Sequence, residues 1–226
     1  MNILVIAAHP DDEVLGCGGT IARESAHHAV QIAILGEGAS SRHDRRSDAP
    51  ADDLQILRAD ALAAAKIIGA TGVELAGLAD NRFDELPLLD VVKTVEQWIR
   101  RYEPDVIYTH HPGDLNVDHG VTFRAVLTAT RPGTHSRTVK EIYAFEVPSS
   151  TEWAFGRIGP AFRPNVFVDV TATLDTKIAA MQCYRTEARP SPHPRSPEAL
   201  RALAAHRGSA AGVVFAEAFD VIRVIR

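Results

Sequence analysis

Two groups of side chains in this sequence have the types and spacing of metal ligands. His9, Asp11 and Asp12 directly follow an apolar run at residues 2–8. Residues 109–119 follow a second apolar run and contain three histidines, two aspartates and one asparagine. Loops that leave the carboxyl ends of neighbouring parallel strands open on one edge of a sheet. Since imidazole nitrogen and carboxylate oxygen both suit zinc, we expect His9, Asp12 and one histidine of the second loop to form a three-ligand centre, with the fourth position left for water.

The neighbouring carboxylates indicate a division of labour. Only one of Asp11 and Asp12 needs to bind the metal, and the other can take a proton from a metal-activated water. The chemistry that this suggests is attack of the activated water on a carbonyl carbon. The alternative is structural: Asp11 or Asp12 caps a helix with Glu13 in its first turn, and Asp118 caps the next one. The presence of two such clusters, each after a core strand, favours the metal site.

The elements that must position these groups alternate along the chain. Apolar runs at 2–8, 30–35, 73–78 and 105–109 predict strands, and helical patterns lie at 20–28, 54–68, 88–102 and 119–130. The remainder is mixed, with expected strands at 141–147, 165–170 and 219–224 and expected helices at 174–184 and 198–207. This order predicts an α/β fold with a mostly parallel sheet flanked by helices and a mixed C-terminal part. Residues 36–52 are polar and irregular, which is typical of a functional loop.

Length and composition exclude several classes of protein. The 226 residues are 46% apolar and 23% charged, which suits a single α/β domain over residues 1–226. A net charge of −5 provides no global basic field, so we expect no nucleic-acid partner. Two cysteines, Cys17 and Cys183, form no disulfide framework and fit a reducing compartment. The first residues are typical of a strand rather than a signal peptide, and no window is apolar enough for a membrane span. We therefore expect a cytoplasmic location. A homo-oligomer is compatible with these features.

The motifs resemble those of a known enzyme family. Ala8-His9-Pro10-Asp11-Asp12-Glu13, followed by Gly16-Cys17-Gly18-Gly19-Thr20, resembles the signature of the LmbE-like (PIG-L) zinc deacetylases. Asn116-Val117-Asp118-His119 resembles the second motif of that family, and residues 207–219 resemble its C-terminal part.

This resemblance implies a Rossmann-like fold and removal of an N-acetyl group from an N-acetylglucosamine-type sugar or sugar conjugate. It implies one Zn²⁺ per chain, although another divalent transition metal would also suit the ligands. His9, Asp12 and His119 would be the metal ligands. Asp11 would be the general base, and Asp118 would orient its neighbours.

One position departs from the family pattern. Many members have a histidine three residues before the distal ligand, where this chain has Asn116. An amide can donate to an oxyanion but cannot protonate a leaving amine. The oxyanion role therefore stays open between Asn116 and His111. His111, Asp114 and His193 are candidates for the acid, or Asp11 does both jobs in turn.

Other residues are candidates for substrate binding. Arg42 lies in a loop that resembles the Gly-Glu loop of the family, whose arginine contacts substrate, although a solvated charged loop is the alternative. Asp80 and Asn81 follow the third strand and either line the cleft or form a simple turn. Asp114 and His193 complete the substrate candidates. Because side chains of a strand alternate between its faces, we expect His111 to face the site and His110 to pack.

Three other functions would also account for some of these features. The glycines 16, 18 and 19 could suggest a dinucleotide enzyme, but their spacing is not G-x-G-x-x-G, and the preceding carboxylates would repel a pyrophosphate. An amidase acting on a larger N-acyl group or a thiol conjugate would use the same metal chemistry. A non-catalytic sugar-binding protein of the same fold is the third alternative.

Overall fold

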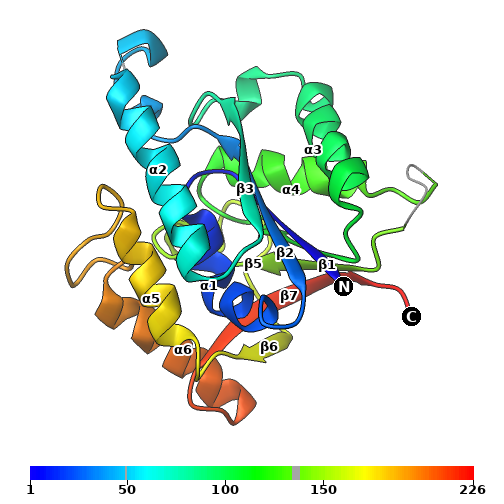
Figure 1. Cartoon of the computed structure of the whole chain (residues 1–226), viewed down its shortest axis with the longest axis vertical. Coiled ribbons are helices and arrows are strands. Elements are labelled where there is room, and N and C mark those ends of the chain that lie inside the picture. The colour runs from blue at the N-terminus through cyan, green and yellow to red at the C-terminus, as the bar shows by residue number, and fades with distance from the viewer. Residues whose placement is uncertain (49, 134–137) are drawn as a thin grey trace.

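The computed structural model of the chain describes residues 1–48, 50–133 and 138–226. These residues form one seven-stranded sheet in the order β3-β2-β1-β4-β5-β7-β6 (Figure 1). The strands are β1 (Asn2–Ala7), β2 (Ala29–Gly36), β3 (Gly72–Leu78), β4 (Val106–His110), β5 (Glu141–Phe145), β6 (Val166–Asp169) and β7 (Ala216–Val224). The neighbouring strands from β3 to β5 pair in parallel, and β7 is antiparallel to both β5 and β6. The expected fold class, a mostly parallel sheet with a mixed C-terminal part, is confirmed.

Helices cover both faces of this sheet. They are α1 (Asp12–Glu24), α2 (Ala51–Ile67), α3 (Leu88–Tyr102), α4 (Val117–Ala129), α5 (Leu174–Cys183) and α6 (Pro197–Ala211). Helices α3 and α4 lie on one face, and α1, α2, α5 and α6 lie on the other (Figure 1). Alternate residues of β1 serve the two layers: Val5 joins the core beneath α1 and α2, and Ile6 joins the core beneath α3 and α4. The continuous apolar run of β1 is therefore explained by burial on both faces.

Helix α1 begins earlier than the sequence pattern predicts. We expected a helix from about residue 20, but α1 starts at Asp12, with a kink at Cys17. Its glycines are needed for close packing: a Cβ on Gly16 would lie 2.3 Å from Cδ2 of Phe145, on β5. Tertiary packing thus overrides the low helix propensity of glycine. As a consequence, Asp12 sits in the first helical turn, directly above the end of β1.

The strand order places the two ligand-rich loops next to each other. Strand β1 lies between β2 and β4. After β1 the chain continues to β2 and β3 on one side of it, and after β3 it crosses to β4 on the other side. In open α/β sheets, ligands bind outside the carboxyl ends of the strands at such a point. The segment after β1 and the segment after β4 therefore meet. None of the helices in the described ranges combines the length and the apolar character that a membrane crossing requires.

Candidate metal centre and its cavity

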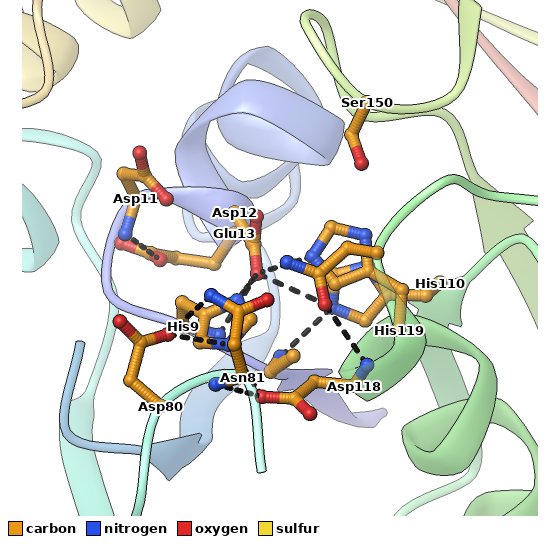
Figure 2. A network of polar contacts seen from close by, with 12 residues as sticks. His9, Asp11, Asp12, Glu13, Asp80, Asn81, His110, Asp118, His119 and Ser150 are labelled. Carbon is orange, nitrogen blue, oxygen red and sulfur yellow. Dashed lines mark hydrogen bonds and ion pairs between the residues drawn. The ribbon is translucent and has the colours of Figure 1, made fainter. Parts of the chain in front are cut away.

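His9, Asp12 and His119 come together in the structure. Their potential ligand atoms all lie within 4.8 Å of one another, and all three residues are buried. Asp12 Oδ2 lies 3.3 Å from His9 Nδ1 and 3.2 Å from His119 Nε2. Figure 2 shows the three side chains converging at the end of β1. The three residues proposed as ligands from the motifs are thus side by side.

The charges at this centre fit a divalent cation. Burial opposes ionisation of Asp12, but the imidazoles of His119 and His110 outweigh it and hold the pKa of Asp12 well below its usual range. Burial likewise lowers the pKa of His119, but Asp12 and Asp114 raise it, to about 9. Nε2 of His119 lies close to Asp12 Oδ2, but the two atoms are not aligned for a hydrogen bond. Two imidazole nitrogens and a carboxylate oxygen that face one another in this way are a donor set that suits zinc or a similar metal.

Each of the two imidazoles is oriented by a second carboxylate. Asp118 Oδ2 lies 2.9 Å from His9 Nε2, and Asp114 Oδ1 lies 3.0 Å from His119 Nδ1. The other nitrogen of each ring is thereby turned toward Asp12, as is usual for metal-binding histidines. Asp118 also accepts hydrogen bonds from the backbone amides of Asn81 and Phe83, at 2.7 and 2.9 Å. Asp118 thus connects His9 to the backbone of the segment after β3.

Asp114 has a different place from the one expected. We predicted a residue that meets substrate, but its carboxylate lies behind His119 and accepts hydrogen bonds from the hydroxyls of Ser150 and Thr151. Although burial opposes ionisation, the contact with His119 and these hydroxyls lowers the pKa of Asp114 to about 2. The expectation failed because the two hydroxyls come from a segment after β5, far along the chain. The Asp114 carboxylate thus lies against Nδ1 of His119, on the opposite side of the ring from Asp12.

Asp11 stands beside the metal candidates in a strained backbone conformation. Its φ is 112°, a region that non-glycine residues rarely adopt. Its carboxylate Oδ2 lies 2.6 Å from Nη1 of Arg195. Burial raises the pKa of Asp11 well above its usual value, and the Arg195 guanidinium opposes that shift. The strain turns a second carboxylate, next to that of Asp12, toward the cavity.

Glu13 and Tyr184 hold this strained turn from below. The Asp11 amide donates to Glu13 Oε2 at 3.1 Å, and the Tyr184 hydroxyl donates to Glu13 Oε1 at 2.5 Å. Burial raises the pKa of Glu13 to about 7, although the Tyr184 hydrogen bond acts in the other direction. Glu13 is fully buried and faces away from the cavity, so its contacts support Asp11 rather than substrate.

The two adjacent histidines at the end of β4 are arranged opposite to our expectation. His110, which we expected to pack, stacks on His119 with ring centroids 3.9 Å apart and lies 3.5 Å from Asp12 Oδ2. Its Nε2 accepts a hydrogen bond from the Ala8 amide at 2.8 Å. His111 instead points away, with Nε2 2.7 Å from the carbonyl oxygen of Pro160. The two side chains do lie on opposite sides of the strand, as expected, but we predicted the wrong one of them to face the metal candidates. His111 therefore lies away from His9, Asp12 and His119.

A cavity of about 550 Å³ opens above the candidate metal centre. Its polar lining includes His9, Asp11, Asp12, Arg42, Asp80, Asn81, Asn116, His119, Glu187 and Arg195. Asn116 is the N-cap of α4, and its side-chain oxygen accepts a hydrogen bond from the Asp118 amide at 2.9 Å. This bond leaves the amide NH₂ group of Asn116 as the donor at the cavity wall.

The remaining substrate candidates surround this cavity to different degrees. Arg42 lines it from a 3-10 turn after β2 and forms an ion pair with Glu187. Asp80 and Asn81 also line it, and Asp80 Oδ1 lies 3.1 Å from His9 Nε2. His193 is set back from the metal candidates, where its ring packs edge-on against Trp153 at 5.8 Å.

Sequence reasoning missed the residues that close the cavity from the C-terminal side. Arg195 contacts Asp11, Glu187 and the hydroxyl of Ser149, to which its Nε donates at 2.8 Å. Both Glu187 and Arg195 belong to the segment between α5 and α6, from which we predicted only His193 as a site residue. No local pattern marks them as site residues, because Arg195 and Asp11 are 184 positions apart.

Comparisons with known proteins find a matching sequence family and proteins of similar sequence and fold. A sequence model of the PIG-L family, described as GlcNAc-PI de-N-acetylase, matches residues 4–130. A 4-oxalmesaconate hydratase of Pseudomonas putida is 30% identical over 80% of this chain and 72% of its own length. An uncharacterised deacetylase of Escherichia coli K12 is also 30% identical, over 82% of this chain and 91% of its own. The N,N'-diacetylchitobiose deacetylase of Pyrococcus horikoshii has the same fold, with a TM-score of 0.76, 23% identity, and coverage of 98% of this chain and 83% of that one.

Proposed function

Since the chain belongs to the PIG-L family of de-N-acetylases, we propose that it hydrolyses the N-acetyl group of an N-acetylglucosamine-type sugar or sugar conjugate to acetate and a free amine. The observation that carries this proposal is the convergence of His9, Asp12 and His119 at the floor of a cavity that Asp11 also lines. A metal site with an adjacent, non-ligating carboxylate is an arrangement that can catalyse hydrolysis of an unactivated amide.

His9, Asp12 and His119 would hold the metal, and Asp114 and Asp118 would keep the two imidazoles in position. A divalent cation bound there supplies a Lewis acid that polarises the acetamide carbonyl and acidifies a water molecule. We assign Zn²⁺ as the metal on the strength of the His₂Asp donor set, one ion per chain.

The chain's own residues would move the proton. Asp11 accepts a proton from water as the water oxygen bonds to the acetamide carbon. The Asn116 NH₂ group donates to the carbonyl oxygen as negative charge develops on it. When the carbon–nitrogen bond breaks, Asp11 returns its proton to the leaving nitrogen. Acetic acid and a neutral amine leave the site, and the acid gives its proton to the amine in solution, so that acetate and an ammonium group result. His111, Asp114 and His193 do not line the cavity, so Asp11 is the group that protonates the leaving nitrogen.

Arg195 would position the Asp11 carboxylate, and other polar residues of the cavity would position the sugar. The guanidinium of Arg195 fixes one oxygen of Asp11 and leaves the other toward the cavity. Arg42, Asp80 and Asn81 offer donors and acceptors for sugar hydroxyls. All three residues line the cavity, and this is what supports their role in substrate binding.

The test uses purified protein freed of metal by chelation and then loaded with Zn²⁺. With N-acetylglucosamine and its glycosides, we expect acetate and primary amine to appear in equal amounts, only after metal is added. The metal-free protein is the control. Hydrolysis that persists without metal, or loaded protein that releases no acetate from any member of the panel, would contradict the proposal.

The cavity lining and one relative favour a second candidate, hydration of an unsaturated carboxylate. Two arginines, Arg42 and Arg195, line the cavity, and guanidinium groups bind carboxylates well. Asn116 stands where many members of the family have a histidine. A similar protein from Pseudomonas putida is a hydratase. Incubation of the loaded protein with an unsaturated oxo-dicarboxylate separates the two activities, since hydration removes the absorbance of the conjugated double bond and releases no acetate.

A further inference from the structure

The cavity above the candidate metal centre has a wall of large apolar side chains. Leu115, Val117 and Trp153, here called the apolar rim, all line the cavity that contains His9 and His119. Their exposed fractions are 47%, 43% and 42%. Large apolar groups that face solvent inside a concave site gain free energy when an apolar ligand covers them.

The apolar rim is held in place by ordered elements. Leu115 and Val117 flank Asn116, the residue that caps α4 through its side chain. Trp153 lies in the 3-10 turn Glu152–Ala154, and its ring packs against His193. A ligand would therefore meet a preformed surface, with little ordering cost on binding.

The C-terminal wall of the cavity has the opposite character. There Glu187 forms ion pairs with both Arg42 and Arg195. We call Arg42, Glu187 and Arg195 the polar wall. If the acetamide of a ligand reaches Asp11 and the metal candidates, the rest of the ligand extends past the polar wall and the apolar rim. The cavity volume of about 550 Å³ leaves room for more than an acetamide group.

We propose that the apolar rim is a subsite for an apolar aglycone, so that the substrate is an N-acetylated sugar conjugate carrying an alkyl or aryl group. This inference rests on the proposed deacetylase function for its choice of sugar. The polar wall receives the hydroxyls of the sugar ring, and Trp153, Leu115 and Val117 pack against the aglycone. Trp153 supplies the largest apolar surface of the three and is the main determinant of this preference.

The kinetic test compares the methyl and hexyl glycosides of N-acetylglucosamine. We expect kcat/KM of the zinc-loaded enzyme to be about tenfold higher for the hexyl glycoside, because the longer chain buries additional methylene groups. Trp153→Ala and Leu115→Ala should bring the ratio of the two kcat/KM values close to one. Leu89→Ala is the matched control, since Leu89 lies on α3, is 60% exposed and does not belong to the apolar rim; the ratio should not change in this variant.

A binding measurement separates this inference from the proposed reaction. The chain has two tryptophans, and Trp98 is buried in the core beneath α3. A saturable change in tryptophan emission on addition of the hexyl glycoside, lost in Trp153→Phe, supports the subsite whether or not acetate is released. Equal kcat/KM values for both glycosides, with no change in emission, overturn it while leaving the deacetylase proposal intact. An emission that changes only with protein concentration also overturns it, because a second copy of the chain then covers the rim.

Discussion

Asp11 is the residue whose role in the proposed reaction can be separated from metal binding. Its carboxylate lies beside the ligand set but pairs with Arg195 rather than with His9 or His119. Asp11→Asn is expected to lower kcat by about 10²- to 10⁴-fold, the usual contribution of a general base. Metal content measured by elemental analysis should stay at the wild-type level. A variant that keeps full activity would remove Asp11 from the mechanism, and one that loses its metal would make Asp11 a ligand.

Glu13 gives a pH-dependent signature. Burial raises its pKa in the folded protein from 4.5 to about 7, so the folded state keeps a proton that the unfolded chain releases between these values. The free energy of unfolding of the metal-free protein should therefore fall as pH rises from about 4.5 to 7, and this group contributes up to roughly 3 kcal/mol of that fall.

Urea unfolding of metal-free wild type and Glu13→Gln across this pH range tests the assignment. The decline should be shallower in the variant, because the amide does not titrate. Parallel curves for the two proteins would show that Glu13 is ionised in the folded state, and would contradict a neutral side chain bridging Tyr184 and the Asp11 amide.

At the scale of elements, the early start of α1 depends on the absence of side chains at its glycines. Gly16 is in contact with the Phe145 ring, whereas Gly120 on α4 has nothing within 4 Å of the position that a Cβ would occupy. Gly16→Ala is expected to destabilise the protein by about 1–3 kcal/mol through overpacking. Gly120→Ala, the matched helical control, should be neutral or stabilising by about 0.5–1 kcal/mol. Chemical denaturation measures both, and equal effects would contradict the packing argument.

The same element explains what could be predicted from local pattern. The strand at residues 2–8 and the helix over 88–102 follow directly from apolar periodicity, and β1 and α3 agree with it within one residue at each end. The start of α1 could not be found in this way, because Gly16 and Gly19 are weak helix formers. In the fold, Phe145 on β5 packs against Gly16, and Val170, directly after β6, packs against Gly19. Both contacts come from segments remote in sequence.

The whole molecule decides which of the motif residues meet. The resemblance and the parallel sheet placed His9, Asp12 and His119 at one edge, and the structure has them together there. Which of His110 and His111 faces the metal candidates depends on the orientation of β4 in the sheet. The sequence alone does not determine that orientation. Arg195 and Glu187 reach the site because the loop between α5 and α6 packs over it. No local sequence pattern indicates this contact.

Metal content per chain tests the central claim most directly. Untagged protein, purified without added metal and then titrated with Zn²⁺ and dialysed, should retain about one ion per chain by elemental analysis. His119→Ala should retain far less, since one of three ligands is gone. Wild-type protein that takes up no zinc, iron or other divalent transition metal would contradict the assignment of His9, Asp12 and His119 as a metal centre, and with it the hydrolytic mechanism.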